Sequence, residues 1–171
     1  MESLLIITGS MGAGKSAVLG EASDILALRN IAHAAIDLDA LGVAHLPTGT
    51  PSDDVMYCNL ASVCKNYASI GVKRILLARA IEGHAELVAC HEAVSAANTV
   101  VCRLTADIET MKQRVEIRET GARQSEFVVR VAKLNAVLDV AKLEDFTITN
   151  ENRSVTEVAQ EMLVKAGWIS L

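Results

Sequence analysis

Short apolar runs alternate with longer amphipathic segments along the whole chain. The apolar runs are strand-sized and lie at about residues 3–8, 33–38, 73–79, 99–105 and 145–149. The segments 15–29 and 55–69 carry apolar residues at the spacing of helices that pack on a sheet. This alternation predicts an α/β fold, in which helices cover both faces of a parallel sheet. We therefore expect a three-layer, doubly wound sheet of five parallel strands.

Local signals mark the ends of two further helices. Asp107 precedes a helical pattern that runs to Ile117. Ser154 and Glu157 have the spacing of a capping box, and the helix that they begin is expected to end near Gly167. The chain should therefore finish with a strand followed by a helix.

Two stretches lack a periodic pattern. Residues 46–54 contain both prolines and Gly49, which predicts a loop. Residues 119–124 are irregular and join two charged helical segments, so a short lid is expected around residues 112–130. Because 171 residues suit one domain with one sizeable core, we expect a single domain over residues 1–171.

The most specific motif lies between the first predicted strand and the first predicted helix. Residues 9–16 read Gly-Ser-Met-Gly-Ala-Gly-Lys-Ser, a phosphate-binding loop in the strand and helix context that the motif requires. Its glycines let backbone N–H groups converge on a phosphate, beside the positive end of the helix. Lys15 should reach the β- and γ-phosphates, and Ser16 should offer its hydroxyl to Mg²⁺. The nucleotide-binding residues expected here are Gly9, Met11, Gly12, Ala13, Gly14, Lys15, Ser16 and Ala17.

Composition and charge narrow the class of protein. Hydrophobic residues make up 51% of the chain and aromatic residues only 3%, so aliphatic side chains must fill the core. The formal net charge of -5 gives no basic field for nucleic acid. The first apolar run leads directly into the phosphate loop, so we expect no signal peptide, no membrane partner and a cytoplasmic location. The four cysteines show no zinc-binding spacing, which favours free thiols.

Two carboxylates, Asp37 and Asp39, follow the second predicted strand. The carboxyl ends of the strands meet at the ligand crevice of a doubly wound sheet, so both acids should lie near the phosphate loop. On an extended chain, residues two apart point the same way. One acid could hold Mg²⁺ through water while the other orients or deprotonates an acceptor hydroxyl. The alternative is a polar loop start in which Asp39 caps a helix.

The third predicted strand ends in Arg79 and carries no acidic residue. Motor ATPases and switch proteins usually have an aspartate at such a strand end, so we assign the metal-side carboxylate to Asp37. The planar guanidinium of Arg79 suits a substrate phosphate, sulfate or carboxylate, which it can bind with two hydrogen bonds. Glu82 could hold Arg79 in place, and the alternative is a purely structural ion pair between the two.

Arginines gather around the irregular stretch, at Arg114, Arg118, Arg123 and Arg130. Arg114 and Arg118 are four residues apart and therefore share one helix face, beside a segment that could close over a triphosphate. A kinase needs such cations to neutralise the transferring phosphoryl group and to expel water. The alternative is a solvated, charged helix, because Glu116 and Glu119 interleave with the arginines.

With these residues in place, the chain resembles the P-loop small-molecule kinases, which include adenylate, shikimate, gluconate and adenylylsulfate kinases. The order of elements agrees over almost the whole chain, although only residues 9–16 form a highly specific motif. The resemblance implies that Asp37 serves the metal and Asp39 the acceptor, as in the D-x-D of shikimate kinase. It also implies that Arg79 binds substrate.

The resemblance extends to the lid and to the second helix. It implies that Arg114 and Arg118 are lid arginines and that Arg130 is a further arginine after the lid. An Asn-Leu helix before a strand that ends in Leu-Ala-Arg is similar to uncharacterised P-loop kinase-like proteins of the actinobacterial type. The substrate-binding residues that we expect are Asp39, Asn59, Arg79, Glu82 and Arg130.

The chain also departs from these families. The glycine triplet that follows the third strand of shikimate kinase is absent, and the long lid of large adenylate kinases cannot fit between residues 119 and 124. The N-K-x-D signature of switch GTPases is absent too. Instead, Asn150 and Arg153 follow the fifth strand and are expected near the purine base.

Together these features imply an ATP-dependent kinase that uses Mg²⁺ and phosphorylates a small-molecule acceptor with an anionic group, as a monomer or a homodimer. The expected catalytic residues are Lys15, Asp37, Asp39, Arg79, Arg114 and Arg118. One alternative is a nucleoside monophosphate kinase. The other is an ATP-binding regulatory protein with little transfer activity.

Overall fold

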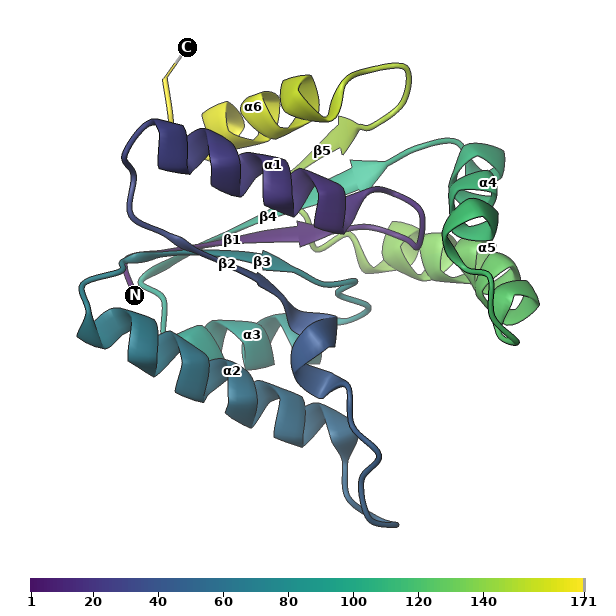
Figure 1. Ribbon diagram of the computed structural model, residues 1–171, viewed down its shortest axis with the longest axis horizontal. Coiled ribbons are helices and arrows are strands. Elements are labelled where there is room, and N and C mark those ends of the chain that lie inside the picture. Colours follow the sequence, from purple (N-terminus) through teal and green to yellow (C-terminus); the bar gives the residue numbers. More distant parts are fainter. Residues whose placement is uncertain (171) are drawn as a thin grey trace.

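The five predicted strands form one parallel sheet. The computed structural model describes residues 1–170, apart from the side chain of Ser52. The strands pair in the order β2-β3-β1-β4-β5 (Figure 1). Their bounds are Ser3–Thr8 for β1, Ala34–Asp37 for β2, Arg74–Ala78 for β3, Asn98–Thr105 for β4 and Phe146–Thr149 for β5. The predicted α/β fold with a five-stranded parallel sheet is confirmed.

Helices cover both faces of the sheet. Figure 1 shows α1 and α6 on one face, α2 and α3 on the other, and α4 with α5 beyond the ends toward which the strands point. The helices are α1 (Lys15–Leu28), α2 (Ser52–Ser69), α3 (His84–Val94), α4 (Ile108–Arg118), α5 (Gln124–Ala141) and α6 (Val155–Lys165), and a 3-10 helix, η1, spans Leu38–Gly42. Within the described residues, no helix is both long and apolar enough to cross a membrane.

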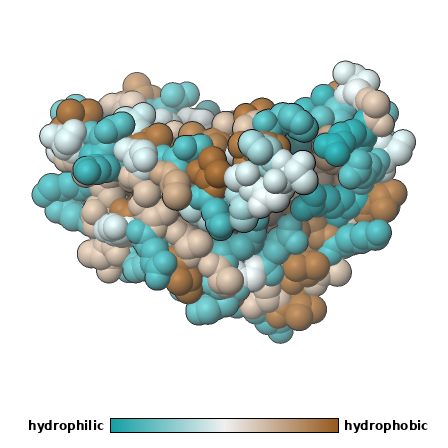
Figure 2. All heavy atoms as spheres, turned by 90° about the horizontal axis from the view of Figure 1, so that it is seen from below, coloured by the Kyte–Doolittle hydropathy of each residue, from teal (hydrophilic) through white to brown (hydrophobic). Residues whose placement is uncertain are grey.

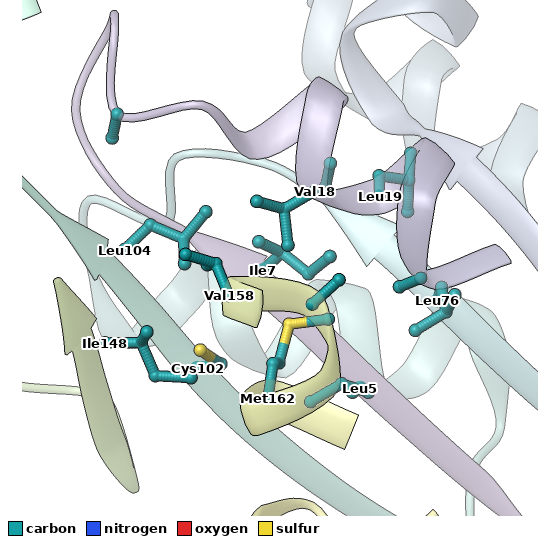
Figure 3. Packing of buried hydrophobic residues seen from close by; sticks show 14 of the residues in the cluster. Leu5, Ile7, Val18, Leu19, Leu76, Cys102, Leu104, Ile148, Val158 and Met162 are labelled. Carbon is teal, nitrogen blue, oxygen red and sulfur yellow. The ribbon is translucent and has the colours of Figure 1, made fainter. Parts of the chain in front are cut away.

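The central strand β1 divides its side chains between two cores. Leu5 and Ile7 are fully buried in the cluster under α1 and α6, which Figure 3 shows around Met162 of α6. Leu4 and Ile6 alternate with them and are buried in the cluster under α2 and α3. The strand is a continuous apolar run because both faces of a parallel sheet are covered. Full burial of each such side chain stabilises the fold by roughly 1.5–3 kcal/mol.

Three local predictions need correction. Helix α3 is missing from the predicted elements, although a parallel connection from β3 to β4 needs a crossover. Helix α2 begins at Ser52, inside the predicted loop, and its first turn carries Asp53 and Asp54, which the positive end of a helix favours. Residue Asp39 lies in η1, not on an extended strand, so the argument that it points the same way as Asp37 is wrong.

The start signals of α4 and α6 form the predicted helix caps. The Asp107 side chain accepts a hydrogen bond from the backbone N–H of Glu109, at 3.0 Å. Ser154 and Glu157 form both hydrogen bonds of a capping box at the start of α6. Gly167 follows that helix with a φ of 71°, a left-handed conformation that favours glycine.

Candidate active site

Glycines shape the loop between β1 and α1 because no other residue fits its backbone. Gly12 and Gly14 have φ angles of 78° and 96°, in the left-handed region. A Cβ on Gly12 would overlap the carbonyl oxygen of Met111, and one on Gly14 would overlap the side-chain amide of Asn150. Helix α1 begins directly after Gly14, so its positive end lies at the loop.

Residues far away in sequence hold this loop from behind. The buried hydroxyl of Ser10 donates to the carbonyl oxygen of Val131 in α5, at 2.8 Å. The side-chain amide of Asn150 donates to the carbonyl oxygen of Ala13, also at 2.8 Å. Arg114 of α4 donates to the carbonyl oxygens of Gly12 at 3.3 Å and Asn150 at 3.0 Å. The loop is therefore fixed by α4, α5 and the segment after β5.

The ammonium group of Lys15 is folded against the loop. Its Nζ donates to the carbonyl oxygens of Gly9 and Ser10, at 3.0 and 3.1 Å. Burial lowers the pKa of Lys15 to about 8, although the charges of Asp39 and Asp37 act in the opposite direction. Because burial disfavours the charged form of Lys15, a bound phosphate would stabilise that charge.

Ser16 and Asp37 meet across α1 and β2. The Ser16 hydroxyl donates to Oδ2 of Asp37, at 2.6 Å. A hydroxyl beside a carboxylate fits Mg²⁺, which binds through few protein groups and keeps waters and phosphate oxygens as its other ligands. Within residues 1–170, no group of three or more His, Cys, Asp or Glu side chains could hold a metal ion.

Arg79 is surrounded by three carboxylates. Its guanidinium forms a short ion pair with Asp39, and it lies 3.8 Å from Asp53 and 3.7 Å from Glu86. Burial lowers the pKa of Arg79, but Asp39 and Glu86 outweigh burial and raise it overall. Arg79 therefore stays charged, and its charge is already used to hold the neighbouring acids.

Glu82 and Asn59 do not have the predicted contacts. Glu82 pairs with Arg130 of α5, at 3.1 Å, and not with Arg79, because Asp39 and Glu86 lie closer to that guanidinium. Asn59 donates to the carbonyl oxygen of Leu41, at 2.9 Å, and so fixes the turn that carries Asp39. The prediction that Glu82 holds Arg79 is wrong, and the Asn59 contact gives no support to a role in substrate binding.

A pocket of about 300 Å³ is lined both by Lys15 of the phosphate loop and by the ion pair of Asp39 and Arg79. It brings together six of the predicted site residues and adds the apolar side chains Phe127 and Leu134 of α5. Its lining consists of Met11, Lys15, Asp39, Arg79, Ala80, Glu82, Phe127, Arg130 and Leu134. A cavity of this size, with charged and apolar side chains in its lining, suits a small metabolite.

The remaining residues that were predicted to bind nucleotide differ in their contacts. Arg118 is largely exposed and pairs with Glu119 at 2.9 Å, whereas Arg114 is bound to the loop itself. Arg153 pairs with Glu161 at 2.7 Å, and buried Asn150 supports the loop. Contact of Asn150 and Arg153 with a purine base stays a prediction.

Several residues of the site escape the sequence analysis. Ser10 anchors the loop, Asp53 and Glu86 surround Arg79, and Phe127 lines the pocket. Asp53 and Glu86 stand in the first turns of α2 and α3, where an acid is ordinary. The one available signal is the motif position of Ser10, inside the phosphate loop.

Solved structures share this architecture. A sugar kinase from Janibacter sp. is 15% identical with a TM-score of 0.67, over 98% of this chain and 95% of that chain. A shikimate kinase from Acinetobacter baumannii, in complex with shikimate, is 16% identical with a TM-score of 0.61, over 99% and 96%. The APS kinase of Mycobacterium tuberculosis, in complex with AMPPNP and APS, is 17% identical with a TM-score of 0.57, over 97% and 98%.

No protein-family model matches the chain, and no curated protein matches it by sequence. The likeness to solved structures is therefore a likeness of fold, and it extends over nearly the whole length of each partner. The chain has the fold of the P-loop small-molecule kinases.

Proposed function

We propose that the protein is an ATP-dependent kinase that transfers the γ-phosphoryl group to a hydroxyl of a small molecule. One observation carries this proposal: the pocket that contains Lys15 of the phosphate loop also contains Asp39 and Arg79 on the acceptor side. A transferase needs both substrates in one cavity, with the reacting atoms in line. A nucleotide-binding regulator would need only the loop.

The phosphate loop holds the triphosphate in this proposal. Backbone N–H groups and the start of α1 bind the phosphates, with Lys15 on the β- and γ-phosphates. Ser16 and Asp37 would hold Mg²⁺, which when bound neutralises charge on the phosphate oxygens. The structurally similar APS kinase, solved in complex with AMPPNP and APS, supports the binding of a nucleotide and a second small molecule by this fold.

Asp39 orients the acceptor. Its carboxylate is held by Arg79 and faces the pocket that Lys15 also lines. As the acceptor oxygen bonds to phosphorus and the bond to ADP breaks, the hydroxyl proton passes to Asp39. The main contribution of the protein is positioning and charge stabilisation, because no covalent intermediate with the enzyme is needed.

The segment 112–130 acts as the lid of a single domain, and Arg118 is its mobile cation. Arg118 is largely exposed and makes its ion pair with the adjacent Glu119, a contact that a triphosphate can replace. Closure would place its charge over the transferring phosphoryl group and expel water. We place this activity in the cytoplasm.

An assay of ADP release tests the proposal. Purified protein with ATP and Mg²⁺ is combined with a panel of hydroxyl-bearing metabolites and, in parallel, with nucleoside monophosphates. We expect acceptor-dependent ADP release with a hydroxyl compound, and formation of its phosphate ester by mass spectrometry. Stimulation by nucleoside monophosphates alone would favour that class of kinase. ATP affinity without any acceptor-dependent release would favour the regulatory protein.

A further inference from the structure

The two guanidinium groups that line the acceptor side of the pocket are outnumbered by the carboxylates within 4 Å of them, two of which, Asp53 and Glu86, lie outside the pocket lining. Two guanidinium groups, from Arg79 and Arg130, face four carboxylates. Those acids are Asp39, Asp53, Glu82 and Glu86. Arg79 is within 4 Å of three of the carboxylates, and Arg130 pairs with the fourth. Both guanidinium groups are therefore already paired with carboxylates.

An anionic acceptor would therefore meet repulsion at Arg79. To reach the guanidinium, a carboxylate or phosphate must displace Asp39 and still lie near Asp53 and Glu86. At such distances these carboxylates repel the negative charge of the ligand, and the repulsion lowers its affinity. The only other cation in the lining is Lys15, which in the proposed function belongs to the nucleotide phosphates.

Part of the pocket lining is apolar. Phe127 and Leu134 of α5 line the pocket together with Met11 of the phosphate loop. The C–H groups of a compact polyol can pack on these side chains while its hydroxyls donate to the carboxylates of Asp39 and Glu82, which also line the pocket. The carboxylates of Asp39 and Glu82 bind hydrogen-bond donors, and the guanidinium groups beside them are already paired with these acids.

We propose that the acceptor is a polyol without an anionic group, either neutral or amine-bearing, with its reacting hydroxyl at Asp39. This inference rests on the kinase function proposed above, and it replaces the sequence-based expectation of an anionic acceptor. Arg79 is then a positioning residue that orients Asp39 and balances part of the acidic charge, and it does not contact an anionic substrate.

A titration with sulfate tests the charge argument without turnover. The phosphate loop is first saturated with AMPPNP and Mg²⁺, and sulfate binding is followed by NMR. Three proteins are compared: wild type, the variant D53N/E86Q, and the control D54N/E92Q, which removes the same charge from the same two helices without touching an ion-paired acid of Arg79. We expect D53N/E86Q to bind sulfate at least tenfold more tightly than wild type and the control. Equal affinity in the three proteins would overturn the proposal.

A matched set of six-carbon acceptors, glucose, glucosamine and gluconate, tests the substrate class. We expect ADP release to be stimulated by glucose or glucosamine and unaffected by gluconate. Stronger stimulation by gluconate would overturn the inference and leave the kinase function standing. If no acceptor in a wider panel stimulates release, the kinase function fails, while the sulfate titration still decides whether Arg79 is closed to anions.

Discussion

The side-chain amide of Asn150 donates a 2.8 Å hydrogen bond to the carbonyl oxygen of Ala13, in the space that the missing Cβ of Gly14 leaves free. The two residues are 137 positions apart in the chain. The conformation of the phosphate loop therefore depends on the segment after β5 as well as on its own glycines.

We expect Asn150→Ala to lower the free energy of unfolding by about 1–3 kcal/mol, because it leaves a buried carbonyl group without its donor. The loosened loop should also bind ATP roughly tenfold less tightly, about 1.4 kcal/mol. Urea denaturation and calorimetric titration measure the two effects. Asn66→Ala, at an exposed position of α2, is the matched control and should change neither. Wild-type ATP affinity in Asn150→Ala would show that the loop does not need this contact.

Lys15→Ala should abolish transfer while the fold remains intact. The Lys15 ammonium contacts only loop carbonyls in its hydrogen bonds, so its loss removes charge from the phosphates and little from the core. We expect kcat/KM to fall at least a hundredfold, about 2.7 kcal/mol of transition-state stabilisation. Lys65→Ala, on the exposed side of α2, controls for loss of a surface lysine. Undiminished turnover in Lys15→Ala would contradict the kinase proposal.

The lowered pKa of Lys15, about 8, makes ATP binding depend on pH. A bound triphosphate favours the charged form and raises this pKa, so the complex binds more protons than the free protein. The contribution of Lys15 to affinity should therefore be constant below about pH 7 and fall as the pH rises through 8, with proton uptake on binding. Calorimetry in buffers of different ionisation enthalpy measures that uptake. In Lys15→Ala the uptake in this range should be absent, and an unchanged value would assign it to another group.

Asp37 and Asp39 should have separable roles because they face different partners, Ser16 and Arg79. We expect Asp37→Asn to raise the Mg²⁺ concentration needed for half-maximal activity. Asp39→Asn should lower the rate with acceptor and spare background ATP hydrolysis. Steady-state Mg²⁺ and acceptor titrations of both variants distinguish these effects. Identical Mg²⁺ titrations for wild type and Asp37→Asn would remove Asp37 from the metal site.

Local patterns in the sequence predict the sheet and the phosphate loop because each depends on neighbouring residues. The apolar run of β1 and the motif at residues 9–16 are complete within a few positions. Helix α3 is missed because it buries only Cys90 and Val94, too few to show a helical period. The carboxylates around Arg79 are missed for a different reason.

The partners of Arg79 come together only in three dimensions. Asp53 and Glu86 stand in the first turns of different helices, and Asp39 lies on a 3-10 turn. Each acid has an ordinary local explanation, as a residue near a helix start, and nothing in the sequence connects the three. The sequence therefore predicts Arg79 at the site, but not that its charge is already balanced.

The last prediction concerns the lid and the different states of its two arginines. Arg118 is largely exposed and pairs with Glu119. If lid closure brings its charge to the transferring phosphoryl group, it stabilises the transition state more than bound ATP. Arg118→Ala should therefore lower kcat with little change in ATP affinity. Arg114 donates to the carbonyl oxygens of Gly12 and Asn150, so Arg114→Ala should also weaken ATP binding through the loop. Arg123→Ala, at an exposed arginine that pairs with Glu126, is the control and should retain wild-type kinetics.

A lid must open to admit substrate, so residues 112–130 should exchange amide hydrogens faster without nucleotide than with AMPPNP. Hydrogen exchange measures this directly, with the β1 strand as an internal reference that is buried in both states. Unchanged protection of the segment, together with full activity of Arg118→Ala, would mean that Arg118 is part of a solvated helix face. The positive charge over the phosphates would then have to come from Arg130, which lines the pocket, or from Arg153 after β5.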